Sequence, residues 1–215
     1  MESNQILEIG AKILALMVAI IGHEIMHGYI AHKYGDDTAK NAGRLSINPL
    51  VHVDLVGTIL LPALLFFSNA PFLFGWAKPV PINMYRVIQN GGYKAAISVA
   101  LAGIVYNFSL AIAATVILGI IPQPTSYIGL FFVYFLIQSL IFNVVLGVFN
   151  LYPIPPLDGS QALTYLALWN KWNGLVRFYE SIERYGMIIL LLLIATPLSE
   201  YFFAPIGYII EWLIN

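Results

Sequence analysis

Four apolar stretches dominate the sequence, and each is long enough to cross a bilayer as a helix. A spanning helix needs about 20 mostly apolar residues. The stretches are residues 6–32, 95–121, 128–151 and 187–214, the last of them interrupted at Thr196-Pro197-Leu198-Ser199. The composition agrees, because 60% of the 215 residues are hydrophobic and 10% are charged, whereas soluble proteins carry about 25% charged residues. The sequence therefore predicts an all-α polytopic membrane protein with four to six transmembrane helices.

A fifth apolar stretch, residues 55–67, is shorter and contains Pro62. A turn signal at residues 68–71 follows it, and the apolar residues 72–74 come next. This pattern suits either a further span or a re-entrant hairpin, which leaves the membrane on the side where it entered.

The basic residues decide between these alternatives, because the positive-inside rule places loops rich in Lys and Arg in the cytoplasm. They fall into three loops: Lys33, Lys40 and Arg44; Lys78, Arg86 and Lys94; Lys171, Arg177 and Arg184. All three loops can share the cytoplasmic face only if residues 55–74 do not cross the membrane. We therefore expect a re-entrant hairpin, with the N-terminus and the loop at residues 122–127 outside.

Composition also limits the function. A net charge of -1 leaves no basic excess to neutralise phosphates, which excludes nucleic-acid binding as a main function. The chain has no cysteine, so any metal must be held by His, Asp or Glu. The first apolar stretch follows Glu2 and no positive charge, so we expect it to stay in the mature protein rather than act as a cleaved signal.

The first apolar stretch contains His23-Glu24-Ile25-Met26-His27. Histidines at i and i+4 on a helix project from one face, close enough to bind one zinc ion, and Glu24 is placed to accept a proton from water. The alternative is a polar spot on a buried helix face, paired internally. One charge near mid-membrane costs about 2.5 to 3.5 kcal/mol, so three ionisable residues within five positions need a compensating partner. This cost favours a metal.

A third ligand is needed, because a zinc hydrolase has three protein ligands and an open fourth position. Asp158 is the candidate, since it follows a segment whose three prolines forbid a helix, and irregular backbone at membrane depth lines a cavity or is buried. The alternative makes Asp158 the N-cap of a helix that starts near Gly159. Independently of this choice, we expect a helix from about residue 160 to 184. Four other carboxylates lie in loops and are expected to be solvated: Asp36, Asp37, Glu180 and Glu183.

Together, the two motifs resemble the site-2 protease family of intramembrane zinc metalloproteases, and are most similar to its short bacterial and archaeal members without a PDZ or CBS domain. They are His23-Glu24-x-x-His27 and Asn150-x-x-Pro153-x-x-Pro156-Leu157-Asp158-Gly159. Further similar blocks follow in family order within about residues 20–160: residues 43–50 with His52, Asp54 and Gly57-Thr58, then residues 75–81, then Ala102-Gly103 with Asn107. One departure is Ile104, where the family usually has proline; it concerns only the local shape near Asn107.

The resemblance implies that His23, His27 and Asp158 bind one zinc ion per chain and that Glu24 is the catalytic base. Asn107 is similar to the family asparagine thought to hold a substrate carbonyl or the developing oxyanion; its alternative role is an interhelical hydrogen bond. The implied substrates are membrane-anchored proteins. The implied location is a bacterial or archaeal cell membrane, with the active site toward the cytoplasmic side.

The sequence leaves two possible roles open for several other polar residues. Asn150 either supports the site or satisfies backbone groups freed at the proline-rich break. His52 and Asp54 are either outer partners of the metal ligands or an interfacial pair, and His32 is expected to be interfacial. Residues 75–81 are expected to be extended and could pair with an unwound substrate as an added strand.

The sequence thus predicts an intramembrane zinc metalloprotease that hydrolyses peptide bonds within or near transmembrane segments of membrane-anchored proteins. We expect a single integral membrane domain, residues 1–215, with a catalytic core at about 6–166 and C-terminal helices at about 167–215. The alternative function is a non-proteolytic metal-binding membrane protein, or a transporter, that uses the same His and Asp site. Neither the substrate nor the oligomeric state follows from the sequence.

Overall fold

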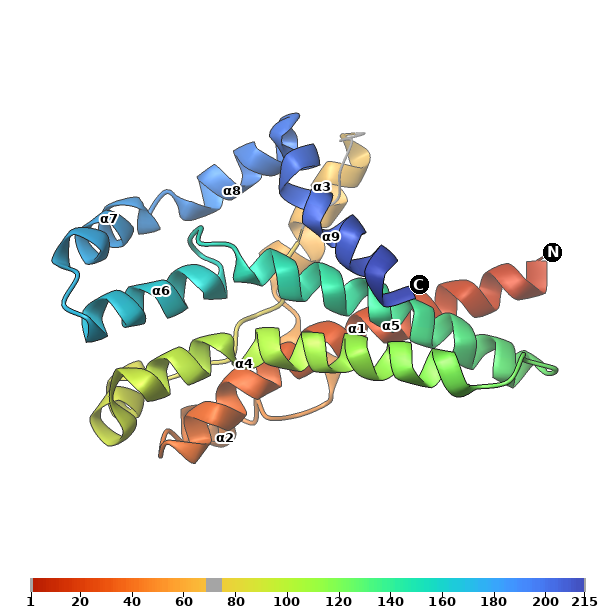
Figure 1. Cartoon of the computed structure of the whole chain (residues 1–215), viewed down its shortest axis with the longest axis horizontal. Coiled ribbons are helices and arrows are strands. Elements are labelled where there is room, and N and C mark those ends of the chain that lie inside the picture. The colour runs from red at the N-terminus through yellow and green to blue at the C-terminus, as the bar shows by residue number, and fades with distance from the viewer. Residues whose placement is uncertain (1, 69–74, 215) are drawn as a thin grey trace.

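The computed structural model describes residues 2–68 and 75–214, and every regular element within these ranges is a helix. Three helices are long and apolar enough to cross a membrane: α1 (Glu2–Lys33), α4 (Met84–Ile120) and α5 (Tyr127–Leu151). They pack against one another along most of their lengths (Figure 1). The predicted all-α membrane fold is confirmed, and the chain is an integral membrane protein.

Helix α1 buries a stripe of every fourth residue against its neighbours. The stripe consists of Ala11, Ala15, Ala19, His23, His27 and Ala31. Small side chains let spanning helices approach closely, and α1 contacts both α4 and α5. The two histidines continue the alanine stripe, so they face the interior of the bundle rather than lipid.

Helix α4 is interrupted at Gly92, whose φ of 66° and ψ of -168° lie outside the helical region. An L side chain rarely adopts a positive φ, whereas glycine does so at little cost. The predicted span at residues 95–121 begins just after this break. The eight residues before Gly92 form a separate helical segment that starts after Asn83, whose side chain accepts a hydrogen bond from the backbone N–H of Arg86.

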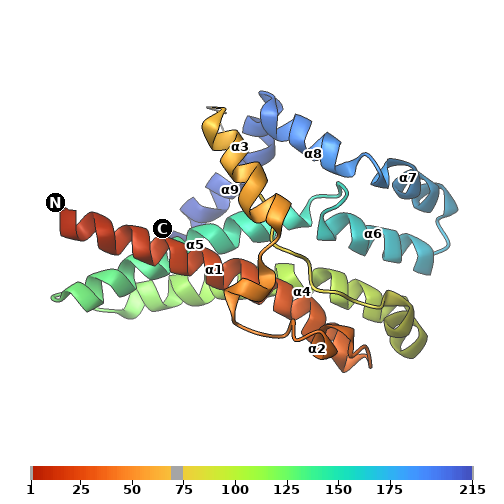
Figure 2. The ribbon, with the colours of Figure 1, turned by 180° about the vertical axis from the view of Figure 1, so that it is seen from behind.

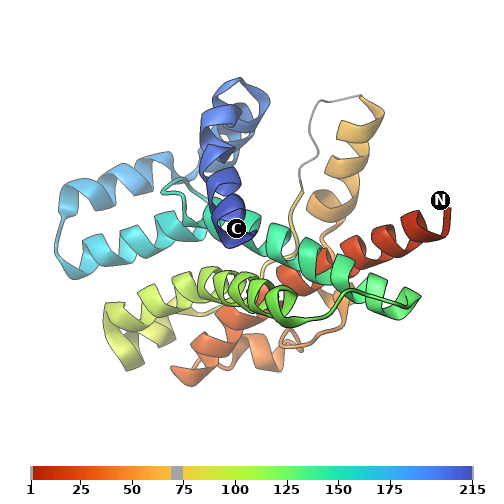
Figure 3. The same ribbon diagram turned by 45° about the vertical axis from the view of Figure 1, so that its right-hand side comes forward.

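The segment expected to form a re-entrant hairpin contains the π-helix η2 (Leu55–Leu60) and α3 (Leu61–Phe67). The backbone N–H of Trp76 donates to the carbonyl of Gly57 at 3.1 Å, so the chain returns to the place where the hairpin began. Thirteen helical residues reach about 20 Å, which is too short to span a hydrocarbon core of about 30 Å. Figure 3 shows these helices projecting from the bundle. The predicted turn at residues 69–71 and the apolar residues 72–74 lie outside the described residues.

The C-terminal part consists of four further helices. They are α6 (Asp158–Trp169), α7 (Asn173–Glu183), α8 (Gly186–Ala195) and α9 (Leu198–Ile214). The predicted interruption near Pro197 is confirmed, because α8 and α9 form a pair bent by 84°. The single helix expected from about residue 160 to 184 is wrong: the chain turns at Lys171, whose φ of 59° is left-handed, and α7 packs back against α6.

The basic loops gather at one end of the molecule. The short helix α2 (Thr38–Asn41), the start of α4 and the α6–α7 pair lie at this end, whereas the N-terminus and the α4–α5 connection lie at the other (Figures 1 and 2). This arrangement is the one expected if residues 55–74 form a hairpin.

The expectation that Asp36 is solvated is wrong. Its side chain is fully buried and accepts hydrogen bonds from the backbone N–H groups of Thr38 and Asn83. Asn83 is distant in sequence, so this partner could not be seen in the local pattern. Asp36 thereby ties the end of α1 to the start of α4.

Candidate metal centre and active site

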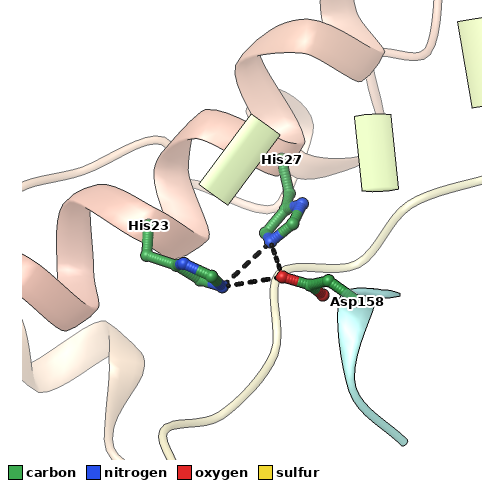
Figure 4. Close-up of side chains that lie close together, drawn as sticks. All are labelled: His23, His27 and Asp158. Carbon is green, nitrogen blue, oxygen red and sulfur yellow. Dashed lines mark hydrogen bonds and ion pairs between the residues drawn. The ribbon is translucent and has the colours of Figure 1, made fainter. Parts of the chain in front are cut away.

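Three ligand atoms converge between α1 and the first residue of α6 (Figure 4). Asp158 Oδ2 lies 3.1 Å from His23 Nε2 and 3.2 Å from His27 Nε2. The two Nε2 atoms are 3.1 Å apart. The structure thus brings together the three residues that the sequence indicates as metal ligands. Leu157, not Asp158, occupies the N-cap of α6.

The local backbone explains how Asp158 reaches α1. The proline-rich segment after α5 carries the chain back toward the bundle, and α6 begins at Asp158 itself. A Cβ at Gly159 would lie only 2.2 Å from the carbonyl oxygen of Leu151. Glycine is therefore required for this close approach, which holds the carboxylate beside the two imidazoles.

The Nδ1 atom of each imidazole makes a hydrogen bond with another part of the protein. His23 Nδ1 lies 2.7 Å from Asn107 Oδ1, and His27 Nδ1 lies 2.7 Å from the carbonyl oxygen of Val99. Both partners are acceptors, so each Nδ1–H donates and each Nε2 presents a lone pair to the centre. Metal-binding histidines usually have such a partner, which fixes the tautomer and the ring orientation.

A metal cation fits this arrangement. Three lone-pair-bearing atoms at 3.1 to 3.2 Å from one another repel unless a cation or added protons lie between them. Zinc bonds of about 2.0 to 2.1 Å in a tetrahedron separate neighbouring ligand atoms by about 3.3 Å, close to the observed triangle. Asp158 Oδ2 is buried, and within the described part of the chain its polar contacts are the two Nε2 atoms. His23, His27 and Asp158 could therefore hold zinc, and at least one further position could admit water.

The charge of Asp158 suits a cation site. Burial by itself would raise the pKa of this carboxyl, but the imidazoles of His23 and His27 beside it lower the pKa to about 2. The carboxylate consequently stays ionised at neutral pH.

Glu24 lies beside the centre and is held by a distant backbone group. Its Oε2 accepts a hydrogen bond of 2.9 Å from the backbone N–H of Val80. Glu24 is half-buried and lines the same cavity as the two histidines and Asp158. Within the described part of the chain, the other carboxylate oxygen of Glu24 has no hydrogen-bond partner.

Residues 75–81 form an irregular segment whose alternate residues are fixed to the protein. Lys78 donates its backbone N–H to the carbonyl of His52 at 2.8 Å, and its own carbonyl accepts from Arg44 at 2.6 Å. Trp76 is bonded at both its N–H and its carbonyl, to Gly57 and Thr58. The backbone of Ala77, between them, makes no hydrogen bond with the described part of the chain. Period-two bonding of this kind is typical of an extended strand with one free edge.

A cavity of about 570 Å³ joins the centre to this segment. Its lining includes the three candidate ligands and Glu24, residues of the 75–81 segment, and apolar side chains of α5 and α8 such as Leu146, Phe149 and Leu190. The lining of the cavity is mainly apolar, and its ionisable residues are the three candidate ligands and Glu24. Such a site suits a largely apolar peptide chain.

Other residues indicated by the sequence lie apart from the ligand atoms. Asn150 lines the cavity, and its amide donates to the carbonyl of Leu146 at 3.0 Å. His52 bonds the carbonyl of Ser46, and Asp54 caps η2 by accepting from Val56 and Gly57. Within the described part of the chain, these bonds join His52 and Asp54 neither to each other nor to a candidate metal ligand, so they support neither of the two interpretations. His32 pairs with Asp37 at 2.5 Å, away from the candidate centre.

Asn107 is fully buried in α4. Its Oδ1 faces His23, while its Nδ2 donates to the carbonyl of Ala19 at 3.3 Å and to Asn143 Oδ1 at 2.8 Å. Both ends of the amide are thus bonded within the protein. This geometry favours the interhelical role over direct contact with a substrate.

Several groups at the site were missed by sequence reasoning. The backbone groups of Val80 and Val99 carry no side-chain signal, so no motif could indicate them. Gly103 was noted only as part of a family block, yet a Cβ there would lie 2.4 Å from His23 Cε1. Asn143 could have been suspected, because it is a lone amide in an apolar stretch and such a group needs a partner in lipid.

These features define a class of protein: an integral membrane protein whose spanning helices enclose a candidate His-His-Asp metal centre next to a glutamate. Comparison with known proteins agrees. The chain is 36% identical over 199 residues to a Bacillus subtilis protein named "Putative zinc metalloprotease YwhC", covering 90% of this chain and 84% of that protein. The chain therefore belongs to the site-2 protease family of zinc metalloproteases.

More distant relatives carry similar names. "Putative zinc metalloprotease Rip2" of Mycolicibacterium smegmatis is 26% identical over 95% of this chain and 75% of that protein. "Putative zinc metalloprotease MJ0611" of Methanocaldococcus jannaschii is 28% identical over 77% of this chain and 71% of that protein. No protein-family model matches the chain, and no solved structure matches it.

Proposed function

We propose that this chain is an intramembrane zinc metalloprotease that cleaves peptide bonds within or near transmembrane segments of membrane-anchored proteins. The observation that supports this most is the triangle of His23 Nε2, His27 Nε2 and Asp158 Oδ2 at 3.1 to 3.2 Å. The triangle lies beside Glu24 in a mainly apolar cavity among membrane-spanning helices. Cleavage inside the membrane requires such a combination, because water, acid–base groups and an apolar substrate must meet there.

The roles of the residues follow from their positions. When bound by His23, His27 and Asp158, zinc lowers the pKa of water and polarises a carbonyl. Glu24 accepts the proton of the attacking water and then delivers it to the amine that leaves. The bond from the Val80 N–H restrains one oxygen of Glu24, which lines the cavity beside the candidate ligands. The apolar walls exclude bulk water from the reacting groups.

The substrate must present an unwound segment to this site, since a helix hides its carbonyls in i to i+4 hydrogen bonds. Ala77 lines the cavity, and its N–H and carbonyl, which make no hydrogen bond within the described part of the chain, can pair with an extended chain. Pro79 and Pro81 have no N–H, so the donors on this edge are few. Helix-breaking residues in the substrate should therefore favour cleavage.

The orientation belongs to the same proposal. The basic loops lie at one end of the molecule, together with α2 and the α6–α7 pair (Figure 1). By the positive-inside rule this end is cytoplasmic, and α6 begins with the candidate ligand Asp158. The active site therefore opens toward the cytoplasmic side of a bacterial or archaeal cell membrane.

The test is proteolysis by the purified protein in liposomes that contain a model membrane-anchored substrate. Glu24→Gln removes the base but none of the candidate ligands, so cleavage should fall by about 10²- to 10⁴-fold while the zinc content stays at the wild-type level. Turnover by Glu24→Gln at the wild-type rate would contradict the mechanism. Zinc uptake into vesicles that is unaffected by Glu24→Gln would favour a transporter instead.

A further inference from the structure

Asn143 lies within α5 and is fully buried, and its hydrogen bonds in the described part of the chain go to Asn107 and Ser139 rather than to a candidate metal ligand. Its position nevertheless connects it to His23 through one intervening side chain. Asn143 Oδ1 accepts a hydrogen bond of 2.8 Å from Asn107 Nδ2, and Asn107 Oδ1 lies 2.7 Å from His23 Nδ1. Nothing in the motifs or in the relatives' names assigns a role to this residue.

The orientation of the Asn107 amide decides the tautomer of His23. With Oδ1 toward the ring, His23 Nδ1 carries the proton and Nε2 presents its lone pair to Asp158 and His27. If the amide were reversed, its NH₂ group would face Nδ1, and the ring proton would move to Nε2. A proton on Nε2 would occupy the position that a metal needs.

Two acceptors hold the Asn107 amide in the first orientation. One is the carbonyl of Ala19 at 3.3 Å, and the other is Asn143 Oδ1 at 2.8 Å. The hydrogen bond to Asn143 is 0.5 Å shorter than the one to Ala19, 2.8 against 3.3 Å, so it restrains the Asn107 amide more strongly.

Asn143 is itself fixed. Its Nδ2 donates to the carbonyl of Ser139, one turn earlier in α5, at 2.8 Å. Its oxygen must therefore point toward Asn107. The hydrogen bonds therefore form a chain: His23 donates to Asn107, Asn107 donates to Asn143, and Asn143 donates to the α5 backbone. Reversing one of the two amides alone would leave a buried amide group without a hydrogen-bond partner.

We propose that Asn143 is a positioning residue that sets the tautomer of His23 and thereby the affinity of the centre for zinc. This inference rests on the proposed function, because it requires that His23 bind the metal through Nε2. A purely structural Asn143 would stabilise helix packing without changing the ring.

The experiment measures zinc affinity by chelator competition, together with the tautomer of the apo protein by ¹⁵N NMR of the imidazoles. Asn143→Leu removes the acceptor and should weaken zinc binding by about tenfold or more, with signals of the Nε2–H tautomer appearing for His23. Asn143→Asp keeps an acceptor toward Asn107 whether or not the carboxyl is protonated, so it should restore zinc affinity to within about threefold of wild type. If Asn143→Leu does not fold, Asn143→Ser, whose side chain is too short to reach Asn107, replaces it.

The matched control is Thr115→Val, which removes a hydroxyl whose hydrogen bond, among the described residues, goes to the carbonyl of Ala111 in its own helix, α4. It should leave zinc affinity and the His23 tautomer unchanged. Unaltered zinc affinity in Asn143→Leu, or an affinity in Asn143→Asp as low as in Asn143→Leu, would overturn the inference. In either case a wild-type protein that binds zinc and cleaves its substrate would leave the proposed function intact, whereas a wild-type protein without zinc would remove both.

Discussion

At the scale of single residues, steric contact as well as hydrogen bonding restrains the position of the His23 ring. Gly103 of α4 lies against the imidazole, and a Cβ at this position would come within 2.4 to 2.6 Å of three ring atoms. The residue that follows, Ile104, is itself buried. Ile104 is not among the residues that line the cavity at the candidate centre.

Gly103→Ala is expected to push the His23 ring away from Asp158 and Asn107. Zinc affinity should fall by about 10- to 100-fold, the range found when partners of metal ligands are disturbed. Gly119→Ala is the matched control, because Gly119 lies in the same helix and a Cβ there meets nothing within 4 Å. The control should bind zinc like wild type and be more stable by about 0.5 to 1 kcal/mol. Equal zinc affinity in the two variants would show that the ring position does not matter.

At the scale of elements, the segment at residues 75–81 links the hairpin to the candidate active site. Its alternate residues are bonded to the hairpin base, to Arg44 and to Glu24. A Cβ at Gly57 would overlap the ring of Trp76 at 2.3 Å, so the close contact between hairpin and segment depends on glycine. A single conformation of this segment therefore both positions Glu24, the proposed base, and presents a backbone edge with which a substrate could pair.

Ala77→Pro tests the substrate edge. The substitution removes the free N–H but breaks no hydrogen bond within the described part of the chain. The loss of one hydrogen bond of about 1 kcal/mol should lower kcat/KM by about fivefold to tenfold, measured on a model substrate, while zinc content is unchanged. Ala77→Ser keeps the N–H and should cleave normally. Wild-type cleavage by Ala77→Pro would mean that substrates do not pair along this edge.

The elements also show which features can be predicted from the sequence. The spans and the His23–His27 pair follow from local spacing, and the prolines after α5 mark the irregular segment before Asp158. The separation of α6 and α7 could not be predicted, because it depends on Lys171 adopting a left-handed conformation that is usual for glycine. The burial of Asp36 and the chain of bonds from Asn143 depend on partners that are distant in sequence.

At the scale of the whole molecule, the basic loops and the candidate active site lie on one side of the bundle. The chain has no cysteine, so a single introduced cysteine is the one thiol that can react with a labelling reagent. Asn41→Cys and Gly174→Cys lie at exposed positions at this end, and Gln123→Cys lies in the exposed α4–α5 connection at the other. In sealed vesicles, the first two should react with a membrane-impermeant maleimide from the same side and the third from the opposite side. Reaction of Gln123→Cys from the same side as Gly174→Cys would contradict the hairpin topology.

The account depends on three side chains, His23, His27 and Asp158, binding a single zinc ion. Zinc-edge X-ray absorption of the purified protein tests this directly, since it reports both the amount of metal and its ligands. We predict one zinc per chain, with two imidazole nitrogens and oxygen ligands at about 2.0 to 2.2 Å, and loss of an oxygen ligand or of the metal in Asp158→Ala. A wild-type protein without zinc, or a spectrum that is identical in Asp158→Ala, would contradict the account.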